Sequence, residues 1–195
     1  QTGERIKMRF YMNGTYGEQQ NSIQAVRMGQ LDVFENGPLP EFYPPAGALF
    51  APYAFKSYEH WEKFKKSETA AKILEEAGKA MGIKFFGFHQ FGFRNAVTTD
   101  RPAKTPEDFA GMKMRTVNVV PYSEVATVLN TIGTPIPITD VYMSLKTGVV
   151  EGTENPLGQI YTEKFYEVTK YLILTNHMLA TSAYMVSEKF WNSLS

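Results

Sequence analysis

The sequence of 195 residues contains no cysteine, which excludes disulfide bonds, thiolate metal sites and cysteine nucleophiles. Its 20 basic residues balance its 20 acidic residues, so the net charge is zero. A neutral chain without a basic block argues against nucleic acid as a partner. No apolar run approaches the ~18–20 residues that a membrane span needs. Since no secretion signal opens the sequence, we expect a mature chain or a part of a longer one.

Residues with catalytic or metal-binding potential are also scarce. The three histidines, His60, His89 and His177, are not spaced with one another or with carboxylates as a metal-ligand set would be, so we interpret them as surface or structural residues. Glu151 and Glu154 lie three apart in a Gly-containing turn, a pattern more typical of solvated or capping carboxylates than of a catalytic pair. The nucleophile-elbow, P-loop and dinucleotide-binding motifs are missing. We therefore expect no metal, no cofactor and no enzymatic activity.

Strand and helix patterns alternate along the chain, which favours an α/β fold with mainly parallel sheets. The segment 36–45 holds four prolines and cannot form a regular element. Segment 148–156 (GVVEGTENP) has the composition of a loop. The patterns predict strands over 5–12, 31–34, 83–88, 92–98, 112–117, 171–174 and 178–186, and helices over 19–28, 58–81, 104–111, 122–129 and 139–146, the last capped by Thr139, with a further helix after Ser187.

Two arginines stand inside apolar strand patterns, Arg94 in FGFRNAV and Arg115 in MKMRTV. Burying an unpaired charge is costly, so each needs an anionic or hydrogen-bonding partner. A planar guanidinium matches a carboxylate with two parallel bonds. The partner is either a ligand carboxylate or, alternatively, water or an internal acid. Aromatic residues near the Pro-rich loops are candidates for the wall of a pocket: Phe42, Tyr43, Phe50, Tyr53 and Phe55.

Several motifs occur together in one order and spacing. They are GFR at 92–94, KTPEDFAGMKMR at 104–115, GTPIP at 133–137, VYMSLKTGVVEGTENP at 141–156 and KFYEV at 164–168. In this arrangement the chain resembles the solute-binding proteins of tripartite ATP-independent periplasmic (TRAP) transporters. The resemblance extends over nearly the whole sequence and is strongest from 92 to 177.

The resemblance implies an α/β fold of the periplasmic-binding-protein type, with two lobes and a ligand cleft between them that closes on binding. Lobe I would contain residues 1–91 and 181–195, and lobe II residues 92–180. Members of this family are about half as long again. We therefore expect an interior fragment in which both lobes are incomplete, without the first strand and helix and without the C-terminal third.

The resemblance also implies a binding site. The arginine that pairs with the ligand carboxylate falls on Arg115, the second arginine on Arg94, and the asparagine that braces ligand and arginine on Asn155. Two stretches depart from the family pattern. The usual Asp-Gly-Gln-Glu-Asn is EGTEN at 151–155, and a frequent phenylalanine is replaced by ITD at 138–140.

The function that the resemblance implies is solute binding in the periplasm, without chemistry. The protein would be a monomer that captures a small organic acid and delivers it to the membrane permease subunits of the transporter. The ligand could be a mono- or dicarboxylate, a sugar acid, an oxo acid or an aromatic acid. Two alternatives remain open: an α/β enzyme that holds a carboxylated substrate through Arg94 and Arg115, and a ligand-binding sensor domain built on the same fold.

Overall fold

The computed structural model describes residues 6–11, 15–17, 19–36, 40–117, 120 and 122–194. The strand expected over 5–12 is wrong in its described part, because residues 6–11 are exposed and belong to no helix or strand. Alternating side chains favour a strand only where a neighbouring strand offers a partner, and the described part of the sheet offers none here.

One sheet organises the described residues, with the strand order β1-β6-β2-β5-β3-β4. The pairs β1/β6, β6/β2 and β2/β5 are antiparallel, and only β3 runs parallel to its neighbours β4 and β5. The expectation of mainly parallel strands is therefore wrong, because alternation along the sequence does not reveal which strands become neighbours. The strands are β1 (Val33–Glu35), β2 (Ile83–Thr98), β3 (Lys113–Thr116), β4 (Ile132–Pro135), β5 (Gly152–Pro156) and β6 (Tyr171–Ser187).

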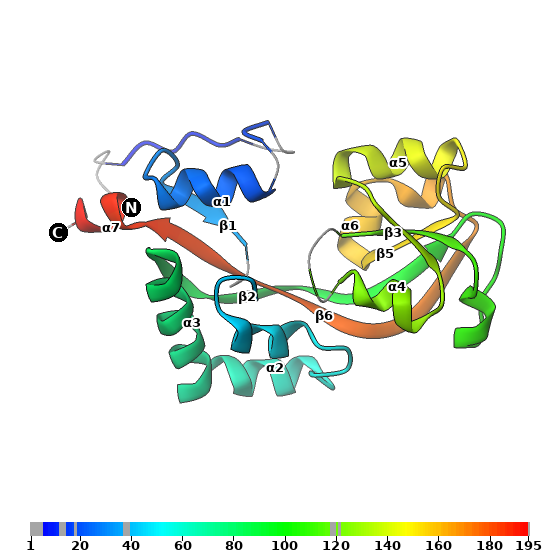
Figure 1. The fold of residues 1–195 in the computed structure, drawn as a ribbon, viewed down its shortest axis with the longest axis horizontal. Coiled ribbons are helices and arrows are strands. Elements are labelled where there is room, and N and C mark those ends of the chain that lie inside the picture. Colours follow the sequence, from blue (N-terminus) through cyan, green and yellow to red (C-terminus); the bar gives the residue numbers. More distant parts are fainter. Residues whose placement is uncertain are drawn as a thin grey trace.

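Strands β2 and β6 are long and run together through the whole molecule (Figure 1). They replace the four shorter strands expected there. In β2, Gly87 and Gly92 are irregularities with positive φ rather than strand ends. The expected lobe boundaries, 91/92 and 180/181, fall inside these two strands. The division into lobes stays a prediction.

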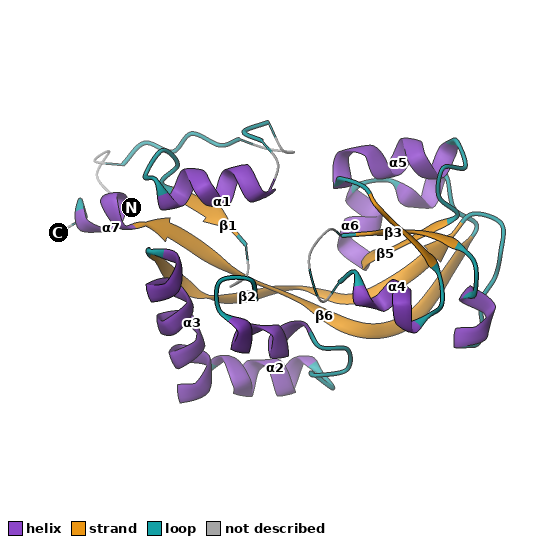
Figure 2. Cartoon of the chain, viewed as in Figure 1, coloured by secondary structure: helices purple, strands orange, loops and turns teal. Residues whose placement is uncertain are grey.

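Helices gather at the two ends of the sheet (Figure 2). One end carries α1 (Gln19–Arg27), α2 (Tyr58–Lys65) and α3 (Glu68–Met81), and the other carries α4 (Glu124–Val128), α5 (Ile138–Lys146) and α6 (Leu157–Thr162). The helix expected over 58–81 is two helices, because the Ser67 hydroxyl accepts a bond from the Ala70 amide and caps α3.

The helix expected over 139–146 begins one residue earlier, after Pro137, so Thr139 is not its cap. The helix expected after Ser187 is confirmed as α7 (Glu188–Asn192). Within the described ranges, none of the helices has the length and apolarity to cross a membrane. Short 3-10 helices form at Pro44–Phe50, Pro106–Phe109 and Phe165–Glu167.

At the α4–α6 end, the sheet is covered on both faces. Val97 belongs to a core cluster with Val141 of α5 and Ile160 of α6. Met114 belongs to a second cluster, with Ala96 and other residues of the opposite face. Successive residues of a strand point to opposite faces, so Val97 and Ala96 mark the two sides. Strand β5 lies between β2 and β3 and is buried along its whole length.

The tight contact at Gly152 generates a prediction. A Cβ atom there would lie 2.5 Å from the Met114 sulfur and 2.8 Å from the Val97 carbonyl oxygen. Gly152→Ala should therefore lower the free energy of unfolding by about 1–3 kcal/mol through overpacking. Gly158→Ala is the matched control, because a Cβ atom there meets nothing within 4 Å. Urea denaturation measures both, and equal stability of the two variants would contradict the packing argument.

Candidate functional site

The segment expected to be a loop, 148–156, ends in the central strand β5. Glu154 is 6% exposed, so the interpretation of this carboxylate as solvated or capping is wrong. Glu151, just before the strand, accepts a bond from the Lys113 amide at 2.9 Å. The glycine content that indicated a loop has another cause, since Gly152 is needed for the close approach to Met114.

Arg94 of β2 is the partner of Glu154. Arg94 Nε donates to Oε2 of Glu154 at 2.5 Å, and Nη2 donates to Oε1 at 2.7 Å and to the Glu154 carbonyl oxygen at 2.6 Å. Arg94 is 5% exposed, and its guanidinium carbon lies 4.8 Å from the centre of the Tyr122 ring. The sequence left the partner of Arg94 open between a ligand carboxylate, water and an internal acid. The structure contains the internal ion pair, with Glu154.

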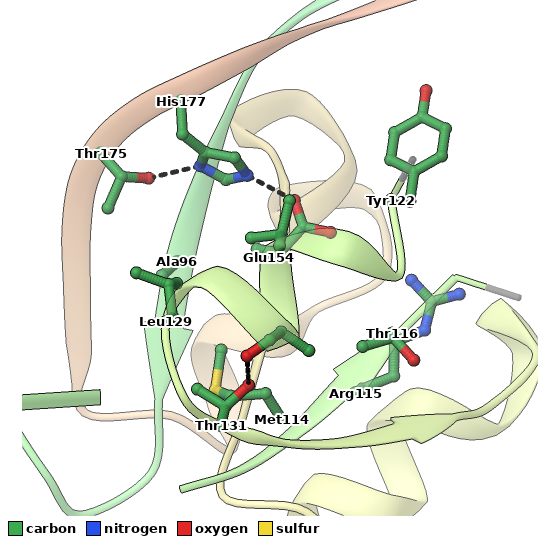
Figure 3. Close-up of a pocket in the computed structure, with 12 residues that line it drawn as sticks. Ala96, Met114, Arg115, Thr116, Tyr122, Leu129, Thr131, Glu154, Thr175 and His177 are labelled. Atoms are coloured by element: carbon green, nitrogen blue, oxygen red, sulfur yellow. Dashed lines mark hydrogen bonds and ion pairs between the residues drawn. The ribbon is translucent and has the colours of Figure 1, made fainter. Parts of the chain in front are cut away.

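His177 of β6 binds the same carboxylate (Figure 3). Its Nε2 lies 3.0 Å from Oε2 of Glu154, and its Nδ1 lies 2.8 Å from the Thr175 hydroxyl. A carboxylate only accepts, so Nε2 carries a hydrogen and donates it to Glu154. Sequence analysis missed His177 because its partner is 23 residues away on another strand. Only the pairing of β2 with β6, where Met178 lies opposite Arg94, brings the histidine here.

Electrostatics in this cluster favour the charged pair. Burial alone would raise the pKa of Glu154, but the charge of Arg94 and the bonds from His177 and Arg94 outweigh it and lower the pKa to about 2. The same carboxylate raises the pKa of Arg94 against the effect of burial. Burial raises the pKa of the Tyr122 hydroxyl to about 12. The pair therefore stays ionised at neutral pH.

Arg115 of β3 has a different environment. Its Nε donates to the Ile136 carbonyl oxygen at 2.8 Å, and no carboxylate of the described residues lies within 4 Å of its guanidinium. The side chain is nevertheless 5% exposed. Burial and the charge of Arg94, partly opposed by Glu154, lower the pKa of Arg115 to about 10. Arg115 is still protonated at neutral pH, so it is a buried cation without a described counter-charge.

Asn155 and Arg115 lie on the same face of the sheet. Gly152 pairs with Met114, and alternation then puts Thr153 and Asn155 on the face of Arg115. Arg94 and Glu154 lie on the other face. The amide of Asn155 accepts from the Thr153 hydroxyl at 3.0 Å and donates to Gln159 at 2.8 Å. The three predicted site residues therefore come from three neighbouring strands, but their roles toward a ligand stay predictions.

Two hollows border these residues. The first (Figure 3) is about 20 Å³ in volume, room for about one water molecule. Arg115, Glu154, His177 and Tyr122 are among the residues that line it. The second is a groove of about 550 Å³. Phe93 and Asn176, which directly precede Arg94 and His177 in the sequence, are among the residues that line it. It includes two of the aromatic residues expected in a wall, and is lined by Tyr53, Phe55, Lys56, Tyr58, Phe93 and Asn176.

Metal-binding groups do not gather in the described ranges: no three histidine, aspartate or glutamate side chains are placed to hold an ion. The polar contacts of the described site residues are charge pairs and hydrogen bonds. Arg115 supplies the unbalanced charge, and the cluster of Arg94, Glu154 and His177, which we call the charged cluster, supplies fixed polar groups beside it.

Comparisons with known proteins agree with the resemblance in the sequence motifs. The model of the family described as "Bacterial extracellular solute-binding protein, family 7" matches residues 1–195. Among curated proteins, the sialic acid-binding periplasmic protein SiaP of Vibrio cholerae is 31% identical over 192 residues, covering 97% of this chain and 60% of SiaP. The C4-dicarboxylate-binding periplasmic protein DctP of Rhodobacter capsulatus is 30% identical over 197 residues, covering 99% of this chain and 58% of DctP.

A solved structure confirms the expected α/β binding-protein fold. It is a TRAP periplasmic solute-binding protein from Polaromonas sp. JS666 bound to D-erythronate, with a TM-score of 0.92 and 28% identity. The match covers 100% of this chain and 64% of the Polaromonas chain. The chain thus spans about three fifths of the length of its relatives, as the motifs led us to expect.

The charged cluster yields a stability prediction. Glu154→Gln leaves Arg94 buried without its counter-charge, which should lower the free energy of unfolding by about 3–5 kcal/mol at neutral pH. Asp100→Asn is the control, because the ion pair of Asp100 with Lys170 is 70% exposed on both sides and should contribute nothing measurable. Urea denaturation at pH 7 measures both variants. A loss no larger in Glu154→Gln than in Asp100→Asn would show that the buried pair is not a stabilising element.

The pH dependence of stability follows from the same group. Because folding lowers the pKa of Glu154 from 4.5 to about 2, its contribution is complete above pH 4.5 and is lost as the pH falls from 4.5 toward 2. Glutamine does not titrate, so the stability of Glu154→Gln should fall less than that of the unmodified protein over this range. Parallel acid-dependent curves for the two proteins would contradict the lowered pKa.

Proposed function

The chain belongs to family 7 of the bacterial extracellular solute-binding proteins, and from this premise we propose that it is the solute-binding component of a TRAP-type transporter. In this proposal the protein captures a small organic acid in the periplasm and delivers it to the membrane subunits of the transporter. The names of its relatives support the location and the ligand class, since they are periplasmic proteins that bind sialic acid, C4-dicarboxylates and D-erythronate.

The observation that carries the proposal is the unbalanced charge of Arg115. Arg115 is 5% exposed, and among the described residues its guanidinium bonds to one carbonyl oxygen, so it retains donors for a further partner. A ligand carboxylate would accept two parallel bonds from its terminal nitrogens and neutralise the charge. Such a partner removes the cost of burying Arg115 alone, which gives the ligand a large part of its binding free energy.

Asn155 supports the same site in a second way. It shares a sheet face with Arg115 and is held by Thr153 and Gln159, so its amide group has a fixed orientation. A fixed amide donor can direct the ligand without adding charge. Arg94, by contrast, would affect ligand binding through Glu154, because most of its N–H donors are already bonded to that residue.

The test of this proposal is the affinity of Arg115 variants. A panel of mono- and dicarboxylates, sugar acids and aromatic acids is first screened against the full-length protein by thermal shift, and the acid that binds is measured by calorimetry. Loss of a buried charge partner costs on the order of 3–5 kcal/mol. Arg115→Ala should therefore bind at least ~100-fold more weakly. Arg115→Lys should also bind poorly, because an ammonium cannot form the two parallel bonds.

Arg27→Ala is the matched control for Arg115→Ala. Arg27 Nε donates to the Met81 carbonyl oxygen at 2.9 Å, the same kind of bond that Arg115 makes with Ile136, but Arg27 is exposed on α1. This variant should bind like the unmodified protein. If Arg115→Ala also binds within a few-fold of it, Arg115 is a structural residue and the proposed site is wrong. If no acid in the panel binds, the proposed function itself is wrong.

Ligand binding should also change the shape of the protein. We propose that the acid lies between two lobes joined by β2 and β6 and that binding closes them, the usual motion of such folds. Small-angle scattering of the full-length protein should then give a smaller radius of gyration with saturating ligand. An unchanged radius, with binding demonstrated by calorimetry on the same sample, would rule out closure.

A further inference from the structure

We infer that Asn95 is a positioning residue: its side chain fixes an irregular segment of β6 and thereby holds His177 against Glu154. Asn95 lies in β2, directly after Arg94 of the charged cluster, and is 1% exposed. The inference concerns contacts inside the protein, so it can be tested whether or not the proposed function is correct.

The irregular segment is visible in the pairing of β2 with β6. Arg94 pairs with Met178, and two residues further along β2 Ala96 pairs with Ile173. The single asparagine between the two β2 residues therefore faces four residues of β6, 174–177, which we call the β6 detour. Antiparallel strands ordinarily match one residue to one, and extra residues leave backbone N–H and C=O groups without partners in the ladder. Where these groups are buried, other partners must hold them.

The β6 detour follows a strained path. Asn176 has a φ of 44°, in the left-handed region, which a residue with a side chain adopts only where its surroundings hold it. Among the described residues, two hydrogen bonds hold the detour from outside. The Asn176 amide donates to Oδ1 of Asn95 at 3.1 Å, and the Tyr53 amide donates to the His177 carbonyl oxygen at 2.8 Å. The first bond is made by a side chain, so a substitution can remove it.

The side chain of Asn95 can hold the detour because it is itself fixed. Its Nδ2 donates to the Phe93 carbonyl oxygen at 3.0 Å, which orients the amide group so that Oδ1 accepts from Asn176. The backbone of Asn95 is fixed as well, because it pairs with Asn155 of the buried strand β5. The amide of Asn95 thus ties the detour to the centre of the sheet.

The β6 detour supplies two residues to the cavity of about 20 Å³, His177 and Thr175. His177 Nε2 lies 3.0 Å from Oε2 of Glu154, and the Thr175 hydroxyl lies 2.8 Å from His177 Nδ1 (Figure 3). Asn95 is not among the described residues that line this cavity. Its effect on the cavity therefore passes through the position of His177.

The experiment follows the Nε2 proton of His177 in the full-length protein, labelled with ¹⁵N-histidine and assigned with His177→Gln. Asn95→Ala removes the acceptor of the Asn176 amide, so the detour should open more often. Exchange of the Nε2 proton with water should then become faster by roughly tenfold or more. The ring resonances of His60 and His89, which lie outside the detour, should not shift.

Thr98→Val is the matched control. Thr98 also lies in β2 and is fully buried, and its hydroxyl donates to the Arg101 carbonyl oxygen. The variant therefore loses a buried side-chain bond of the same strand but leaves the bond between Asn95 and Asn176 in place. Its Nε2 proton of His177 should exchange as in the unmodified protein. If Asn95→Ala leaves this exchange unchanged, or if both variants accelerate it equally, Asn95 does not position His177.

Amide hydrogen exchange of the unmodified protein gives a measurement that needs no folded variant. Asn176 is exposed, so without the bond to Asn95 its amide would exchange near the intrinsic rate of a peptide. With the bond, exchange should be slower by about tenfold or more. Exchange of this amide at the intrinsic rate would overturn the inference. Absence of binding by every acid in the screen would overturn the proposed function and leave this inference standing.

Discussion

The structure depends on the buried ion pair between Arg94 and Glu154. It joins β2 to β5, and His177 adds β6 to the same cluster, so three neighbouring strands share one set of polar contacts. Neither charge could be buried alone at an acceptable cost. A shift of one residue in the β2/β5 register would place the two side chains on opposite faces of the sheet. The pairing of charges and the register of the central strands are therefore a single constraint.

The same pair determines the electrostatic character of the candidate site. Because Glu154 pairs with Arg94, Arg115 is left as a buried cation without a carboxylate partner among the described residues. A site built in this way separates two tasks that the sequence alone would assign to both arginines. One arginine is paired with a carboxylate of the protein, and the other bonds to a carbonyl oxygen and has no described carboxylate partner. Because both arginines are buried, water screens their charges less than it would at the surface.

Local signals in the sequence were sufficient for most helices. Helix α1 and the helix after Ser187 lie where apolar spacing and capping residues predicted them, because such signals act within a few residues. The separate strands expected over 83–88 and 92–98, and the single helix expected over 58–81, were wrong. The break between α2 and α3 comes from a local cap, since the Ser67 hydroxyl accepts from the Ala70 amide. In β2 a distant contact decides, because the partner strand β6 keeps β2 continuous across Gly87 and Gly92.

The sequence by itself determined the family, the α/β class and the two arginines that need an anionic or hydrogen-bonding partner. Motif order, composition and a charged residue in an apolar run are all visible along the chain. Only the tertiary structure decided which arginine is already paired. Glu154 lies 60 residues from Arg94, and its burial depends on β5 being inserted between β2 and β3. The strand order and direction that bring Arg94, Glu154 and His177 together come from long-range pairing, which leaves no local pattern in the sequence. The free energy of a buried charge depends on everything that surrounds it, so it too is decided only by the tertiary structure.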